Sequence, residues 1–194
     1  MIKNTWVYLT TGMKLVLITA VILGNSCGPA LSGDELRDAI ELVDVDTVWE
    51  KKYYQPWPPK LILVPSISFR IKNVGDKPLQ YIYCNAIFRQ ADENENLGDN
   101  FVAGIRGKKV MPGDSSDIIR MQSFLGVEGK NLAHFKNNPA WKKVVARVFV
   151  KSKGAQYVQV GEYDVSQKIN FTEPEDVVPP GEKKQADEKK NPVA

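Results

Sequence analysis

The segment from residue 35 to residue 171 consists of short stretches in which apolar and polar residues alternate, separated by turn-forming residues. In one stretch Ile67, Phe69 and Ile71 alternate with polar residues, which predicts a strand with one buried face because successive strand side chains point to opposite faces. In residues 79–89 both the odd-numbered and the even-numbered positions are largely apolar, so both faces of the strand would be buried, which predicts a central strand. Seven or eight such strands, without regularly alternating helices, predict an all-β fold in which two antiparallel sheets form a sandwich.

One short helical insert is expected in this sandwich. Residues 126–141 carry apolar side chains at helical spacing, and Pro139 should end the helix. Pro65 is expected at the start of a strand or at a bulge, because proline cannot donate to a sheet ladder. Residues 91–100 are polar and are predicted to form a loop.

The first 27 residues have the three-part layout of a secretory signal. Met13 and Lys14 precede an apolar run that ends at Leu23, and small residues then lead to Cys27. This apolar core is shorter than the ~20 residues that a bilayer-spanning helix needs. The alternative is a permanent transmembrane helix that reaches back to Trp6. Such a helix would contain Lys14, at a cost of about 2.5–3.5 kcal/mol.

Residues 24–27, Gly-Asn-Ser-Cys, resemble the lipobox of bacterial lipoprotein signal peptides. They depart from that pattern because its preferred leucine lies three places before the cysteine, whereas Leu23 lies four places before it. The resemblance implies that Met13 is the true start, that residues 1–27 are the signal peptide, and that Cys27 is diacylated and becomes the mature N-terminus. Gly28 after the cysteine implies outer-membrane sorting, since aspartate there favours inner-membrane retention. We therefore expect an extracytoplasmic protein anchored at the periplasmic face of the outer membrane.

The mature chain divides into a spacer, a domain and a tail. Residues 28–34 read as a short flexible spacer, and residues 35–171 form the sandwich domain. Residues 172–194 contain four prolines and few large apolar side chains, so this tail is predicted to be disordered.

Three turn regions resemble those of the Ig-like domains of bacterial envelope lipoproteins, including the FxLYD-type group. They are residues 69–78, residues 86–92 and residues 111–114, the last reading Met-Pro-Gly-Asp. The Leu-Tyr-Asp core of the named motif is absent. The resemblance implies an Ig-like sandwich that serves as a binding or spacer module, with no catalytic residues to carry over.

The candidate partner patch is aromatic and comprises Trp49, Tyr53, Tyr54 and Trp57. Prolines surround Trp57 and are expected to hold the backbone extended, as in a polyproline helix. Tyrosine and tryptophan are favoured at recognition surfaces because each contributes a large area at low entropic cost. The alternative is that these rings pack over the sandwich edge between the first two strands.

The other chemistry-bearing residues favour structural roles. Cys84 lies in an apolar stretch and is interpreted as a small buried hydrophobe. A catalytic thiol would need a nearby histidine or a cationic setting, and nothing in the sequence places His134, the only histidine, near Cys84. A Cys27–Cys84 disulfide is the weaker alternative.

A faint calcium-loop pattern starts at Asp92 and continues through Asn94 and Asn96. It fails where an EF-hand needs glycine and glutamate, because Leu97 and Ala103 occupy those positions. No metal, cofactor or catalytic residue is therefore predicted.

Charge excludes one class of partner. Residues 1–27 hold two of the 26 basic residues and none of the 23 acidic ones, which leaves 24 basic and 23 acidic residues in the mature chain. Such a chain has no field to attract nucleic acid. We expect a non-enzymatic accessory, scaffold or protein-interaction lipoprotein with an envelope protein as partner. The alternative is a periplasmic ligand-binding or carrier lipoprotein in which residues 128–141 cover the pocket. A hydrolase has the least support.

Overall fold

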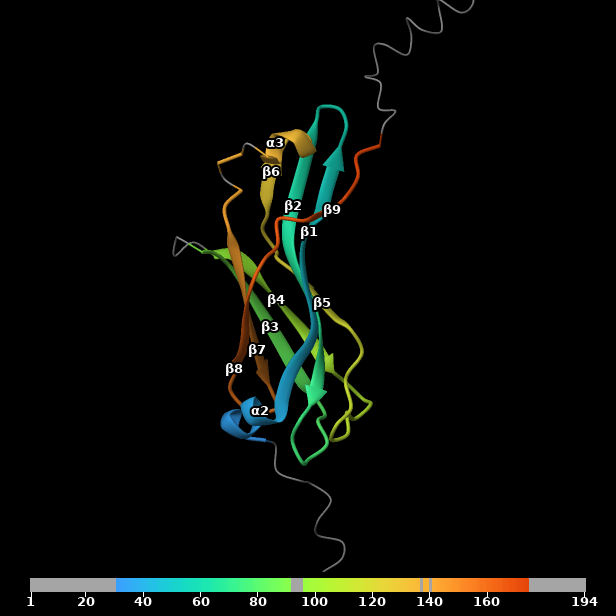
Figure 1. Ribbon diagram of the computed structural model, residues 1–194, viewed down its shortest axis with the longest axis vertical. Coiled ribbons are helices and arrows are strands. Elements are labelled where there is room, and N and C mark those ends of the chain that lie inside the picture. Colours follow the sequence, from blue (N-terminus) through green and yellow to red (C-terminus); the bar gives the residue numbers. More distant parts are fainter. Residues whose placement is uncertain (1–30, 92–95, 137, 140, 175–194) are drawn as a thin grey trace, which may run out of the picture. The chain divides into compact units, whose positions relative to one another are not determined.

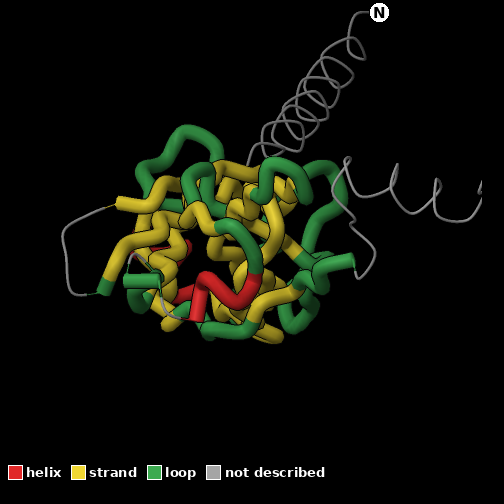
Figure 2. Tube along the Cα trace, turned by 90° about the horizontal axis from the view of Figure 1, so that it is seen from above, coloured by secondary structure: helices red, strands yellow, loops and turns green. Residues whose placement is uncertain are grey.

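The computed structural model describes residues 31–91, 96–136, 138, 139 and 141–174. They form two β-sheets that pack against each other, which confirms the predicted all-β sandwich (Figure 1). Figure 2 shows the same strands, helices and loops from above, along the long axis of Figure 1. Within the described part of the chain, no helix has the length and apolar character needed to cross a membrane. The predicted signal segment lies outside the described residues.

The first sheet is built on a long hairpin. Its strands β1 (Ile40–Gln55) and β2 (Lys60–Asn73) pair antiparallel. The other edge of β2 is shared by two strands, β6 (Val127–Gly129) along its first part and β5 (Ile119–Gln122) along its second. On the free edge of β1 lies β9 (Ile169–Asn170), and among the described strands only this pair is parallel.

Pro65 lies inside β2, so the prediction of a strand start or a bulge is wrong. The register shifts of the β1–β2 pair fall between Val43 and Asp46 and between Lys51 and Tyr53. Pro65 lies instead where the partner of β2 changes from β6 to β5, and its carbonyl accepts a hydrogen bond from the Ser123 N–H at 2.9 Å. A missing donor costs little at such a break in the ladder.

The second sheet has the strand order β4-β3-β7-β8 and is antiparallel throughout. Its strands are β3 (Ile82–Gln90), β4 (Asn96–Ile105), β7 (Val144–Lys151) and β8 (Val158–Asp164). β3 is central, as predicted, and turns Cys84, Ala86 and Phe88 inward. β4 begins at Asn96, so residues 96–100 are strand where a loop was predicted, because pairing with β3 compensates for their polar composition.

The core lies between the two sheets. Its largest fully buried side chains are Trp49, Phe69, Phe88 and Phe135. The apolar residues of the alternating stretches face this interior, as the period of two predicts. Burial of this apolar surface is the main source of the fold's stability.

Two short helices accompany the strands. α2 (Gly33–Ala39) begins with a capping box between Ser32 and Glu35 and buries Leu36 against the core. α3 (Leu132–Lys136) is the expected helical insert, but it has five residues and the predicted span of 126–141 is wrong. Residues 127–129 form β6 because they pair with the edge of β2 through backbone hydrogen bonds. α2 lies at one end of the sandwich, and α3 lies near the turn of the β1–β2 hairpin at the other (Figure 1).

Candidate functional site

The end of the β1–β2 hairpin presents aromatic side chains to solvent. Residues 56–59 form the connecting turn, so the predicted extended polyproline-like segment is wrong, because Gln55 and Lys60 already pair as the last rung of the hairpin. Trp57 in the turn is 58% exposed and Tyr53 is 41% exposed. The Gln55 side chain links them, since it accepts a hydrogen bond from the Tyr53 hydroxyl and donates one to the Trp57 carbonyl at 3.0 Å.

Two of the four predicted patch residues do not belong to this surface. Trp49 is 1% exposed and packs edge-on against the Trp141 ring at 5.8 Å, so its assignment to a partner patch is wrong. Tyr54 is half-buried and packs on Phe171, with ring centroids 5.2 Å apart. The register shift between Lys51 and Tyr53 is the cause, because it puts Tyr54 on the core side of β1 together with Trp49 and turns Tyr53 to the opposite side.

Two further apolar side chains, which the sequence analysis missed, lie beside the hairpin. Phe124 and Leu125 are 70% and 52% exposed in the loop between β5 and β6. Lys52 of β1 joins this loop to the hairpin, because its ammonium lies 4.5 Å from the centroid of the Phe124 ring and donates to the Phe124 carbonyl. We call Tyr53, Trp57, Phe124 and Leu125 the hairpin patch. The only sequence signal for the last two is a pair of large apolar residues directly before Gly126, where the predicted helix begins.

The loop that carries Phe124 and Leu125 is held in place by hydrogen bonds on both sides. The Leu125 N–H donates to the Leu97 carbonyl at 3.1 Å, and the Ser123 hydroxyl donates to the same oxygen at 2.7 Å. Just before the loop, Gln122 donates to the carboxylate of Glu50, which is 8% exposed. The patch is therefore presented by fixed backbone, which lowers the entropic cost of binding.

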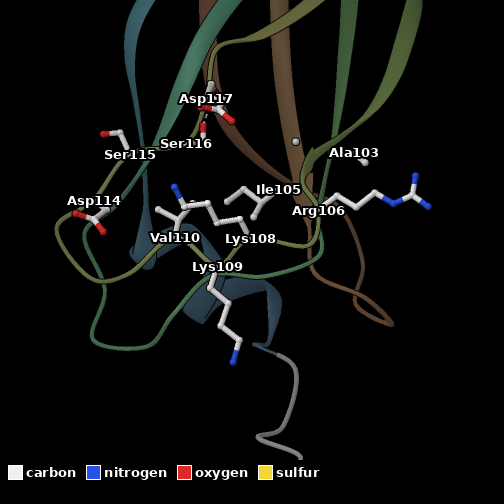
Figure 3. Close-up of a pocket in the computed structure, with 11 residues that line it drawn as sticks. Ala103, Ile105, Arg106, Lys108, Lys109, Val110, Asp114, Ser115, Ser116 and Asp117 are labelled. Carbon is white, nitrogen blue, oxygen red and sulfur yellow. Dashed lines mark hydrogen bonds between the residues drawn. The ribbon is translucent and has the colours of Figure 1, made fainter.

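A hollow of about 400 Å³ lies between the end of β4 and residues 114–117 (Figure 3). Lys108 and Asp114 line facing walls, while the side chains of Arg106 and Lys109 extend outward in different directions. None of residues 128–141 lines this hollow, so the expected cover over a ligand pocket does not apply to it.

Cys84 is a buried free thiol, as predicted. Burial raises its pKa to about 12, against a small opposing effect of a hydrogen bond from the Gly104 backbone. The thiol is therefore protonated and unreactive at neutral pH. Cys27, the predicted lipid attachment site, lies outside the described residues.

His134 is exposed on α3, and its Nδ1 accepts a hydrogen bond from the Lys130 N–H at 3.4 Å. In the described segments no three side chains of histidine, cysteine, aspartate or glutamate gather as a metal site would require. Of the faint calcium pattern, Asp92 and Asn94 lie outside the described residues, and Asn96 is the first residue of β4.

Comparison with known proteins finds weak structural likeness only. No family model matches the sequence, and no curated protein matches it. The crystal structure of an ApaA candidate from Bordetella pertussis is 15% identical, with a TM-score of 0.35 over 66% of this chain and 94% of its own. The X-ray structure of the structural genomics target SoR45 is 12% identical, with a TM-score of 0.39 over 74% and 99%. Both scores are too low to bear on function.

Proposed function

We propose that this protein is a lipid-anchored envelope protein that acts as a non-enzymatic accessory or scaffold by binding another protein through the hairpin patch. The observation that carries the proposal is the exposure of four large apolar side chains, two at the end of the hairpin and two in the β5–β6 loop that Lys52 joins to β1, with Trp57 at 58% and Phe124 at 70%. Exposed large apolar side chains on a folded domain mark interaction sites, and tryptophan and tyrosine dominate the binding energy at such sites.

The position of the patch agrees with a tethered interaction module. The described chain starts at Leu31 beside α2, and the turn of the hairpin lies at the opposite end (Figure 1). β1 has 16 residues. At 3.2–3.4 Å per residue, it spans about 50 Å. Cys27 is four residues before Leu31 in the sequence, so a lipid on it would tether the domain through its α2 end, opposite the turn that carries Trp57.

The interaction is tested by affinity capture of the tagged, full-length protein from mildly cross-linked envelopes. We expect one envelope protein to be recovered at a constant ratio, and Trp57→Ala to reduce its recovery at least tenfold. Ile118→Ala is the matched control, because Ile118 is 59% exposed and lies outside the patch. Recovery that is equal for wild type and Trp57→Ala, or no partner at all, contradicts the proposal.

The anchor has its own test. Cells expressing the full-length protein are labelled with radioactive palmitate, and the label should appear in wild type and disappear in Cys27→Ala. Unlabelled wild-type protein would remove the lipid anchor while leaving the patch interaction open to the capture experiment.

A second function, ligand binding or carriage, is favoured by the hollow beside β4. A volume of about 400 Å³ lies within the range of small-molecule sites. Lys108 on its wall would suit a ligand with an acidic group. Native mass spectrometry of protein purified from envelopes should then show a bound small molecule that Lys108→Ala loses, and protein without bound mass would count against carriage.

A further inference from the structure

The outward face of the second sheet carries an aromatic cluster. Strand register places Phe101 of β4 and Phe149 of β7 opposite Asn85 of β3, one on either side. Tyr83 lies two residues before Asn85 on the same face, and Tyr157 directly precedes β8. We call Tyr83, Phe101, Phe149 and Tyr157 the aromatic face.

The rings of this cluster meet across the sheet although β4 and β8 are its opposite edges. The Phe101 and Tyr157 rings are 6.2 Å apart between centroids and meet edge to face. The ammonium of Lys151 lies 4.8 Å from the centroid of Tyr157 and 6.0 Å from that of Tyr83. Phe101 nevertheless remains 58% exposed. The other three rings are half-buried, so solvent reaches the cluster mainly at Phe101.

Asn85 lies beneath these rings and is incompletely paired. It is 9% exposed, and its Oδ1 has no hydrogen-bond partner among the described residues. Native proteins leave few buried acceptors unpaired, because such an acceptor loses its bonds to water and gains nothing in return. An unpaired acceptor at the centre of this aromatic cluster points to a donor that a ligand supplies.

The charges of this face cancel. Asp99, Glu162 and Asp164 supply three negative charges, and Arg89, Arg147 and Lys151 supply three positive ones, on the same outward face of the sheet. Arg147 and Glu162 form an ion pair at 2.6 Å. A strongly charged ligand such as a polyanion therefore finds no net attraction here.

We propose that the aromatic face binds a neutral oligosaccharide, with pyranose rings stacked on Phe101 and Tyr157 and a sugar hydroxyl donating to Asn85. A pyranose offers C–H groups on its faces, which are attracted to the electron-rich faces of aromatic rings. It also offers hydroxyl donors at its edges, which supply the bond that the Asn85 Oδ1 lacks. An apolar protein surface would match the rings but would leave that oxygen unpaired. Access requires Phe101 to rotate aside, and its exposure on an edge strand permits this.

The test is a calorimetric titration of the full-length protein with cellotetraose and, separately, with chitotetraose. We expect at least one to bind with a Kd below about 1 mM. Phe101→Ala should weaken that binding about tenfold by removing one stacked ring. Asn85→Val should weaken it at least as much, while its thermal midpoint should not fall, because valine removes the unpaired acceptor. Ile118→Ala is the matched control and should bind like wild type, because Ile118 is 59% exposed and lies outside the aromatic face.

Binding that Phe101→Ala and Asn85→Val leave unchanged would overturn the proposal, and so would the absence of heat with both sugars. The titration could instead show only the heat of a dissociating dimer, and Phe101→Ala could abolish that heat. This result would assign the face to a second copy of the chain and would also overturn the proposal. The proposal does not rest on the hairpin patch, so the capture experiment and this titration fail independently.

Discussion

The structure buries Trp49 and exposes Trp57, and unfolding experiments can measure the resulting difference in their contributions to stability. Trp49 is 1% exposed and packs against Trp141, which in turn packs edge-on against Phe135 at 5.9 Å. Replacing a buried aromatic residue by alanine typically costs about 3–5 kcal/mol, through lost transfer free energy and the cavity that remains. The lost ring–ring contact with Trp141 keeps the expected value for Trp49→Ala near the middle of that range, at about 4 kcal/mol.

Trp57→Ala should behave differently, because an exposed turn residue away from buried features changes stability by about 0.5 kcal/mol or less. For a chain of this size 1 kcal/mol corresponds to about 2–4 °C in Tm. We therefore expect Trp49→Ala to lower Tm by roughly 8–16 °C and Trp57→Ala by roughly 2 °C at most.

The assay is urea and thermal unfolding of full-length protein followed by far-ultraviolet circular dichroism, which reports the strands and does not depend on the tryptophan removed. The two variants serve as controls for each other, since both lose the same indole. A loss below about 1.5 kcal/mol in Trp49→Ala, or above about 2 kcal/mol in Trp57→Ala, would refute the assignment of core and surface.

Three further expectations concern stability. Burial raises the pKa of Cys84 to about 12, so above an ordinary thiol pKa of about 8.5 the unfolded chain releases a proton that the folded chain retains. Unfolding free energy should therefore fall as pH rises from about 8.5 towards 12, and urea unfolding of Cys84→Ala across this range should show a shallower fall. Gly104→Ala places a methyl group 2.6 Å from the Cys84 sulfur and should cost about 1–3 kcal/mol. In Cys84→Ala the same change should cost less, and additive costs in the double variant would contradict the clash. Ser32→Ala removes the capping box with Glu35 and should cost about 1 kcal/mol in urea unfolding, whereas Ser32→Asp should retain most of the stability.

The period of two in the sequence predicted the strands and the orientation of many side chains. Ile67, Phe69 and Ile71 face the core, and Cys84 is buried on the inner side of a central strand. These features depend on local geometry, because a strand alternates its side chains whatever its partner is. The turn-rich segments between strands likewise predicted a sandwich without knowledge of the pairing.

Tertiary pairing decided which aromatic residues reach the surface. The register shift after Lys51 depends on how β1 meets β2, and it separates Tyr53 from Tyr54. Phe124 gained its place through loop contacts with strands far away in the sequence. Residues 127–129 became a strand because the edge of β2 was available, although their spacing predicted a helix.

The aromatic face shows the same limit most clearly. Phe101, Asn85 and Tyr157 come from three separate parts of the sequence, and none of them stands out from its neighbours in the sequence. The sequence by itself determined which segments become strands and which of their faces are apolar, because these follow from residue type and spacing. Only the tertiary structure decided strand order and register, because the free energy of long-range pairing depends on partners that no local pattern specifies.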